Sequence, residues 1–193
     1  MLKLIFACLW YLLPAALGNH NASCGNRLPL PGALKRPLEK LAVPIDSGKT
    51  FDGREILGKN KTWRGLVVGV ITGILVAGIQ ALLFFNIHFF RNNTVIDYGR
   101  FNFILIGALM GGGALLGDLA ESFIKRRLGK PSGRPWFPWD QLDWIIGAMV
   151  LSSIVFVPPL RVAAVTLLLY VCVHLASDRV VARLGIKKRE EVN

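Results

Sequence analysis

The sequence contains few cysteines, few histidines and few acidic residues. Its three cysteines, Cys8, Cys24 and Cys172, lie far apart and form no Cys-x-x-Cys pair. An odd number of isolated cysteines argues against a disulfide framework and against a zinc site. Only 12 residues are acidic whereas 23 are basic, which gives a formal charge of +11.

Charged residues of both signs are also scarce, at 18% of the chain, whereas 53% of the residues are hydrophobic. A soluble domain of 193 residues is seldom so apolar, and a soluble nucleic-acid-binding protein with this charge would be far more polar. We therefore expect the bilayer, and no nucleic acid, as a partner. The excess positive charge fits the cytoplasmic flanks of membrane helices and a phosphate site.

Five apolar segments approach the roughly 20 residues that cross a bilayer. They are residues 2–17, 66–90, 101–116, 142–157 and 162–176. Helices are expected because every backbone polar group must be satisfied inside lipid. The sequence thus predicts an all-α polytopic membrane protein with about five transmembrane helices and a cytoplasmic loop domain.

The basic residues predict how the chain is oriented in a cell membrane. Lysine and arginine favour the cytoplasmic side, and they gather in the loop 19–64, in the connection 125–139 and near the C-terminus. The exceptions are Lys3, Arg91, Arg100 and Arg161. We expect the N-terminus outside and the active site on the cytoplasmic side. A cleaved signal at residues 1–18 is the alternative, but it would leave the basic loop outside.

These patterns divide the chain into a first transmembrane helix (1–18), a cytoplasmic loop or lid (19–64), helices two to five with a catalytic loop (65–182, loop 125–139) and a basic tail (183–193). Proline and glycine are frequent in the first loop, which favours turns over long helices. We expect residues 41–46 and 50–54 to pair as a hairpin around residues 47–49. Its apolar content favours an ordered lid or clamp.

Acidic and basic residues gather after the third apolar segment. Asp118, Glu121, Ser122 and Lys125 are spaced to share one face of a helix. A Glu121–Lys125 ion pair is the simplest explanation for two of them. It leaves Asp118 unexplained, because no base lies near Asp118 in the sequence.

Two further acids open the fourth apolar segment. Asp140 and Asp143 are three residues apart, and one acid near a helix N-terminus is explained by the helix dipole. Two acids facing the same way exceed that need. With Asp118, they could form an all-oxygen Mg²⁺ site that leaves positions open for phosphate.

The pattern Ser122-x-x-Lys125-Arg126, followed by Asp140-x-x-Asp143, resembles the signature of the CTP:phosphatidate cytidylyltransferases, or CDP-diacylglycerol synthases.

A second block agrees. Asp52-Gly53-Arg54, Gly58 and Lys61-Thr62-Trp63-Arg64-Gly65 look most like the archaeal branch of the family, the CDP-archaeol synthases. The resemblance is close over residues 46–65 and 111–148. The chain departs from the bacterial and eukaryotic pattern by lacking a Lys-Asp and a His-Gly-Gly before Asp140, and by carrying Gln141.

The resemblance implies transfer of CMP from CTP to a lipid glycerophosphate, of the archaeal diether type, in phospholipid biosynthesis. The products are a CDP-lipid and pyrophosphate. It implies Mg²⁺ as cofactor, held by Asp118, Asp140 and Asp143. It implies phosphate contacts by residues of both blocks, namely Lys61, Thr62, Ser122, Lys125, Arg126 and Arg127.

The resemblance also makes Asp52 and Arg54 candidates for orienting the nucleotide. An Arg54–Asp52 pair that only shapes the loop is equally compatible with the sequence. Thr62 is expected either to contact phosphate or to cap the following helix. Trp63, Trp136 and Trp139 are expected to anchor the chain at the headgroup level.

Two other function classes and the oligomeric state stay open. An ion or solute transporter would place charges near the bilayer centre on several helices, whereas here they cluster at one edge. An alcohol phosphatidyltransferase that consumes a CDP-lipid would carry a denser run of Asp and Gly. A homodimer is compatible with the sequence.

Overall fold

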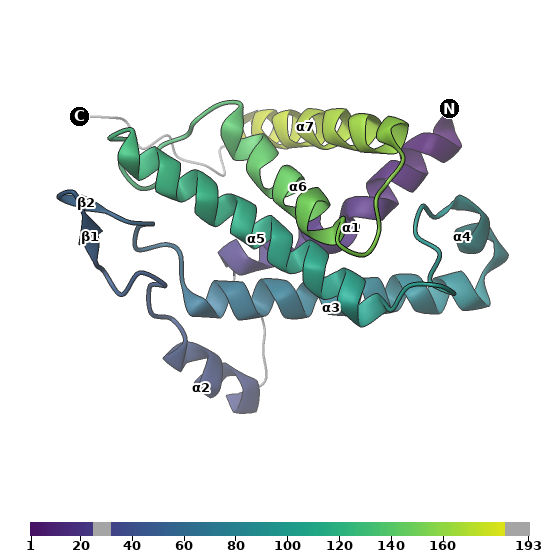
Figure 1. Cartoon of the computed structure of the whole chain (residues 1–193), viewed down its shortest axis with the longest axis horizontal. Coiled ribbons are helices and arrows are strands. Elements are labelled where there is room, and N and C mark those ends of the chain that lie inside the picture. The colour runs from purple at the N-terminus through teal and green to yellow at the C-terminus, as the bar shows by residue number, and fades with distance from the viewer. Residues whose placement is uncertain (25–31, 184–193) are drawn as a thin grey trace.

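The computed structural model describes residues 1–24 and 32–183, and residues 25–31 and 184–193 lie outside this description. Within the described residues the elements follow one another as shown in Figure 1. They are α1 (Leu2–Cys24), α2 (Gly32–Lys40), β1 (Thr50–Phe51), β2 (Arg54–Glu55), α3 (Trp63–Asn86), α4 (His88–Asn93), α5 (Phe103–Arg127), α6 (Trp139–Ser152) and α7 (Leu160–Arg183). After Arg183, the predicted basic tail falls outside the described residues.

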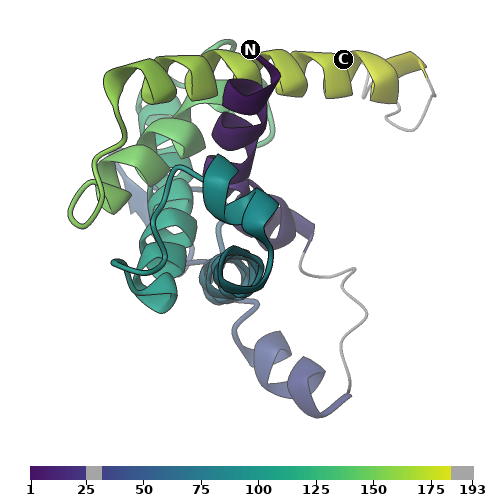
Figure 2. The same cartoon turned by 90° about the vertical axis from the view of Figure 1, so that its right-hand side faces the viewer.

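The predicted helical membrane class is confirmed. Among the described residues α1, α3 and α5 are long and apolar enough to cross a bilayer. The 14 residues of α6 span about 21 Å, less than the roughly 30 Å of a hydrocarbon core. The apolar part of α7 covers Leu160–Val173. Figure 2 shows α7 crossing the bundle at a steep angle to α3, which is seen nearly end-on.

Two predicted segments differ in extent from the helices. The first helix continues beyond residue 18 to Cys24. Residues 66–90 do not form one helix, because Ile87 has an extended backbone (φ −126°, ψ 115°) that separates α3 from α4. The short α4 then leads into the connection to α5.

Glycines on α5 let it pack closely against both of its neighbours. A Cβ on Gly107 would lie 2.6 Å from the carbonyl oxygen of Gly73 on α3. A Cβ on Gly113 would lie 2.5 Å from the carbonyl oxygen of Gly147 on α6. These glycines therefore serve close helix packing, as small residues do in other membrane proteins.

The hairpin predicted between residues 41–46 and 50–54 is wrong. Instead β1 pairs antiparallel with β2, with Thr50 opposite Glu55. The turn contains Asp52 and Gly53, whose φ values of 55° and 70° suit a tight two-residue hairpin. Residues 41–45 pair with the start of α3, through an isolated bridge between Pro44 and Thr62.

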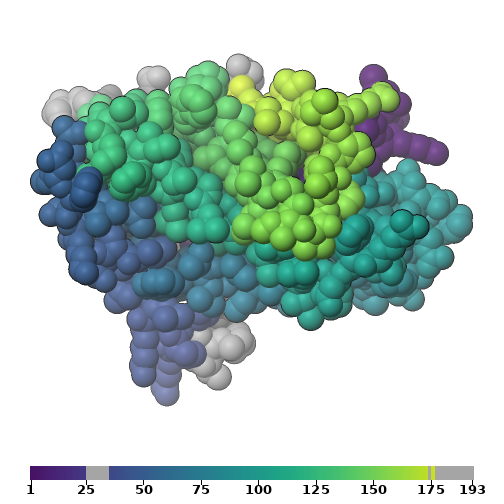
Figure 3. Space-filling model, in the orientation of Figure 1, coloured from purple at the N-terminus to yellow at the C-terminus, as the bar shows by residue number. Residues whose placement is uncertain are grey.

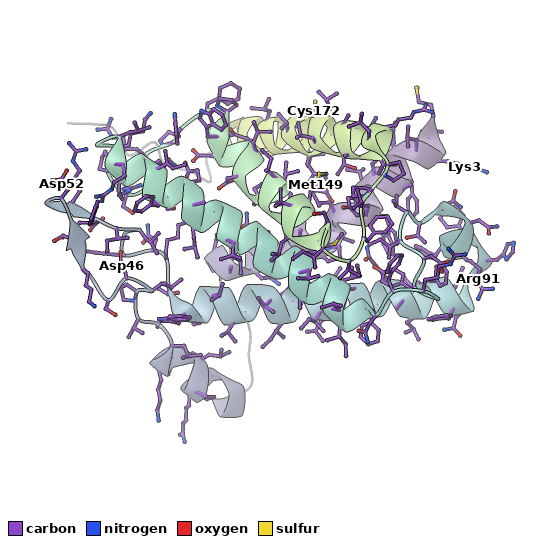
Figure 4. All side chains as sticks on the ribbon, viewed as in Figure 1. Lys3, Asp46, Asp52, Arg91, Met149 and Cys172 are labelled. Atoms are coloured by element: carbon purple, nitrogen blue, oxygen red, sulfur yellow. The ribbon has the colours of Figure 1, made fainter. Side chains whose placement is uncertain are left out.

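The side chain of Asp46 stabilises the loop around the β1–β2 hairpin. Figure 4 shows Asp46 near this hairpin, whose turn contains Asp52. The Asp46 carboxylate accepts backbone hydrogen bonds from Gly48 (3.0 Å), Leu57 (2.9 Å) and Gly58 (3.2 Å). Burial raises the pKa of Asp46, but these hydrogen bonds outweigh it and the pKa is lowered. The ionised carboxylate thus orders the loop that leads into β1 and α3.

Candidate active site

The predicted site residues come together at one end of the bundle. The start of α3 and the start of α6 both pack against the C-terminal half of α5, which also contacts β2 of the hairpin (Figure 1). α3 and α6 begin at this end whereas α5 finishes at it. The alternating direction of the helices therefore gathers residues that are far apart in the sequence.

Lys61 and Asp118 form an ion pair at the centre of this end. The Lys61 Nζ atom lies 2.7 and 2.6 Å from the two carboxylate oxygens of Asp118. Both side chains are about one quarter exposed, at 24% and 25%. Lys61 therefore supplies the base that Asp118 lacks among its neighbours in the sequence. Lys61 comes from the segment before α3, a distant position that only the fold brings close.

Lys125 holds two further carboxylates. Its Nζ atom lies 3.0 Å from Glu121, which confirms the expected ion pair, and it also contacts Asp140. Asp140 in addition accepts a hydrogen bond from the backbone N–H of Trp136. The Lys125 side chain is only 9% exposed, so in this arrangement Lys125 links α5 to α6.

Asp143 lies one turn further along α6. Its Oδ1 atom accepts a 2.7 Å hydrogen bond from the N–H of Trp144. The main chain of Asp143 packs against Gly117 on α5, since a Cβ on Gly117 would lie 2.8 Å from the carbonyl carbon of Asp143. This contact between α5 and α6 therefore involves the residue that precedes Asp118.

The predicted three-carboxylate metal site is not assembled. In the described part of the chain no group of three His, Cys, Asp or Glu side chains is close enough to hold a metal ion. The reason is that Asp118 faces Lys61 whereas Asp140 faces Lys125. The oxygen donors suit Mg²⁺ chemically, and Asp118 and Asp143 belong to the closely packed contact between α5 and α6 at Gly117.

Arg127 and Arg54 are both engaged with the hairpin backbone. The Arg127 guanidinium donates hydrogen bonds to the carbonyl oxygens of Phe51, Arg54 and Glu55. Its Cζ atom also lies 5.2 Å from the ring centre of Phe51 and 5.4 Å from that of Phe123. These contacts fasten the hairpin to the end of α5.

Arg54 completes this connection in the opposite direction. Its Nη1 atom donates a 2.6 Å hydrogen bond to the carbonyl oxygen of Arg127. Among the described residues Arg54 makes no ion pair with Asp52, so the pair considered from the sequence is absent. Asp52 is exposed at the turn.

A basic pocket of about 600 Å³ lies between the hairpin and the turn after α5. Arg126 lines it and is only 5% exposed. Its Nε and Nη1 atoms are buried and have no hydrogen-bond partner among the described residues. The other lining residues are Arg54, Glu55, Lys59, Asn60, Gly129, Lys130, Pro131 and Ser132. A buried guanidinium with free donors in a basic pocket is suited to an anion such as phosphate.

Sequence reasoning missed Lys59, Lys130 and Ser132 as lining residues. Lys130 and Ser132 belong to the turn that departs from the bacterial pattern, and that departure was the available signal. The Lys130 Nζ atom also lies 5.4 Å from the ring centre of Trp136.

A second, smaller pocket of about 40 Å³ lies between the end of α1, the start of α3 and the second half of α5. Lys61, Thr62 and Asp118 line it. Thr62 caps α3, since its side-chain oxygen accepts a 3.2 Å hydrogen bond from the N–H of Gly65. This confirms the capping alternative. Ser122 is buried, at 4% exposure, and lines neither pocket.

Comparisons with known proteins agree on one family. A family described as "CarS-like: CDP-archaeol synthase" matches residues 1–190. A CDP-archaeol synthase from Methanocaldococcus jannaschii is 36% identical over 188 residues, which covers 96% of each chain. One from Archaeoglobus fulgidus is 34% identical over 196 residues, which covers 97% of this chain and 98% of the relative.

A solved structure is also similar. It is described as "Structural insight into an intramembrane enzyme for archaeal membrane lipids biosynthesis". The two chains share 29% sequence identity with a TM-score of 0.64, and the match covers 88% of this chain and 91% of the other.

Proposed function

The chain belongs to the CarS-like CDP-archaeol synthase family, and on that premise we propose how its residues carry out the reaction. It is a CTP-dependent cytidylyltransferase that forms a CDP-activated archaeal lipid in a membrane. The observation that carries the proposed site is Arg126, a buried guanidinium with unpartnered donors that lines the basic pocket.

The basic pocket binds the triphosphate of CTP in this proposal. Arg126 lines the pocket with a buried guanidinium, and Lys59 and Lys130, which also line it, add positive charge for the phosphates. Arg54 also lines the pocket, so it contributes charge while it holds the hairpin. Arg127, whose donors are directed to backbone carbonyls, supports the hairpin and so shapes the nucleotide site.

Asp118 and Asp143 would hold Mg²⁺. The close packing of Gly117, the residue before Asp118, against the main chain of Asp143 supports this choice, because a divalent cation relieves the repulsion between neighbouring carboxylates. When bound, the cation neutralises charge on the triphosphate. Asp140 would join these two metal ligands only if its ion pair with Lys125 breaks. Once the carboxylates bind the metal, Lys61 and Lys125 become available to phosphate oxygens.

The reaction is attack by a phosphate oxygen of the lipid on the α-phosphorus of CTP. A new P–O bond forms there, the bond to the β-phosphate oxygen breaks, and pyrophosphate leaves with that electron pair. The nucleophile is already anionic, so a general base is not required. The main obstacle is repulsion between two polyanions, which Lys61, Lys125 and Arg126 reduce by neutralising charge that develops in the transition state.

The smaller pocket lies where a membrane-bound substrate could present its phosphate. It opens between α1, α3 and α5, and it brings Lys61 and Asp118 beside apolar side chains such as Leu66 and Leu115. We place the lipid phosphate at this position and CTP at the basic pocket. A substrate with two chains then keeps its hydrocarbon in the bilayer. An unsaturated diether glycerophosphate is expected to be used faster than phosphatidic acid, measured as CDP-lipid formed.

In the proposed topology the chain crosses the membrane five times, through the long helices α1, α3 and α5 and through α6 and α7. The N-terminus of α1 is outside and the site faces the cytoplasm, as the distribution of basic residues favours. Charges gathered at one end of the bundle do not fit a transport path through its centre. A homodimer stays a prediction from the sequence.

Replacing Arg126 tests the nucleotide site. Arg126→Gln is expected to raise the KM for CTP by about tenfold to a hundredfold, because a charge-assisted phosphate contact contributes about 1.5–3 kcal/mol. Arg134→Gln removes the same charge from an exposed residue of the same turn that does not line the pocket, and it should leave the KM within about twofold. Equal KM values for the two variants would contradict the proposed nucleotide position.

A further inference from the structure

The helix α2 stands outside the bundle. Among the described elements it contacts only α3. Figure 1 shows it to the side of the N-terminal turns of α3, and Figure 2 shows it standing away from the other helices. In Figure 3 it projects from the lower edge of the molecule. An isolated helix of nine residues is marginal in water. Its position therefore indicates that a surface outside the chain supports it.

The exposed side chains of α2 are mainly basic. Lys35, Arg36 and Lys40 are exposed, and Glu39 is the one acid of the segment. None of these four side chains takes part in an ion pair within the described chain. The positive charge of α2 is consequently left to an anionic partner.

Large apolar side chains accompany these charges. Leu41, Val43 and Trp63 are 36%, 52% and 44% exposed. Their backbones are joined, because Trp63 donates a 3.2 Å hydrogen bond to the carbonyl of Val43, and Arg64 donates one of 2.8 Å to that of Leu41. Trp63 begins a helix that is long enough to cross a membrane. This apolar group therefore lies where that helix leaves the bilayer, a level that tryptophan favours.

We propose that α2 lies on the membrane surface and binds the headgroups of anionic lipids. Lys35, Arg36 and Lys40 contact the negative headgroups, and Leu41, Val43 and Trp63 enter the boundary between headgroups and hydrocarbon. Basic residues beside an apolar group, next to a membrane-crossing helix, are the features of a helix that lies in this interface. A bilayer is continuous at this position, whereas a separate protein partner would have to displace lipid to reach the apolar group.

The attachment also affects the site. Ile45 donates a 2.8 Å hydrogen bond to the carbonyl oxygen of Lys61, so the segment after α2 is bonded to the residue that pairs with Asp118. An anchored α2 fixes this segment at the membrane surface. Lys61 is thereby held at the depth of the lipid phosphate.

Hydrogen exchange of the full chain in nanodiscs tests the proposal. Amides of residues 35–41 are compared in phosphatidylcholine and in a mixture of phosphatidylcholine and phosphatidylglycerol. Since a basic residue near an anionic surface strengthens attachment about fivefold, three of them should slow exchange about a hundredfold in the anionic membrane. The difference should shrink at high salt.

Two charge variants complete the test. The triple substitution Lys35→Gln, Arg36→Gln and Lys40→Gln should abolish the difference between the two membranes. The matched substitution Lys3→Gln, Arg100→Gln and Arg161→Gln removes three exposed charges that lie outside α2 and should preserve it. Equal exchange of wild-type α2 in both membranes, whether fast or slow, would overturn the proposal. It would also be overturned if both triple variants lost the difference between the two membranes to the same extent.

Discussion

Replacement of Gly117 by alanine is expected to lower CTP turnover by about a hundredfold, a cost that a displacement of about 1 Å can impose on a reaction. A Cβ at Gly117 would collide with the carbonyl oxygen of Asp143, and it would lie 2.8 Å from the carbonyl carbon of the same residue. These are backbone atoms, so α6 must move away from α5. The movement would displace both Asp140 and Asp143 from the other site residues.

Gly112→Ala is the matched control on the same helix. A Cβ there would meet only side-chain atoms of Val70 at 3.8 Å and Leu151 at 3.9 Å, which are ordinary contacts. We expect unchanged turnover and an unchanged or slightly higher melting temperature, because alanine is a better helix former than glycine. Gly117→Ala should lower the melting temperature through overpacking. Wild-type turnover by Gly117→Ala would show that the spacing of α5 and α6 does not set the site.

Replacement of Asp118 by asparagine is expected to lower kcat by about a thousandfold, the scale seen when a group that stabilises transition-state charge is removed. Asp118 pairs with Lys61 and lines the small pocket. The amide keeps the shape of the side chain but loses its charge. It can then neither hold Mg²⁺ well nor position Lys61.

A binding measurement separates this effect from misfolding. Mg²⁺ should raise the melting temperature of the wild-type protein but not that of Asp118→Asn. Asp97→Asn provides a control, because Asp97 is partly exposed near the start of α5 and its ion pair with Arg100 is at the surface. We expect Asp97→Asn to keep both activity and the response to Mg²⁺. Equal kcat values in the two variants would contradict the proposed role of Asp118.

The hydrophobic pattern predicted the helical class and most of the helix positions, because apolar segments long enough to cross a bilayer can be recognised in the sequence. It also placed the charged residues at one end of the bundle. The pattern failed at the hairpin, where Ser47-Gly48 and Asp52-Gly53 are both adequate turns and each adopts positive φ. Tertiary hydrogen bonds from Arg127 to the β1–β2 backbone favour the second turn for the hairpin.

The pairings within the site could not be predicted from local sequence. The Lys61–Asp118 pair joins residues that are 57 positions apart. Helical spacing predicts only pairs within one helix, such as Glu121 with Lys125. Arg127 follows Arg126 directly, yet Arg126 faces the basic pocket whereas Arg127 turns to the hairpin. Two adjacent arginines that look equivalent in the sequence therefore take different roles because a helix directs neighbouring side chains to different sides.

The most direct test of the central claim is the stoichiometry of the reaction. Purified protein, CTP, Mg²⁺ and an unsaturated diether glycerophosphate should yield CDP-lipid and pyrophosphate in equal amounts, and Asp143→Asn should yield neither above background. Failure of the folded wild-type protein to consume CTP, or equal turnover by Asp143→Asn, would contradict the assignment of cytidylyl transfer to this end of the bundle.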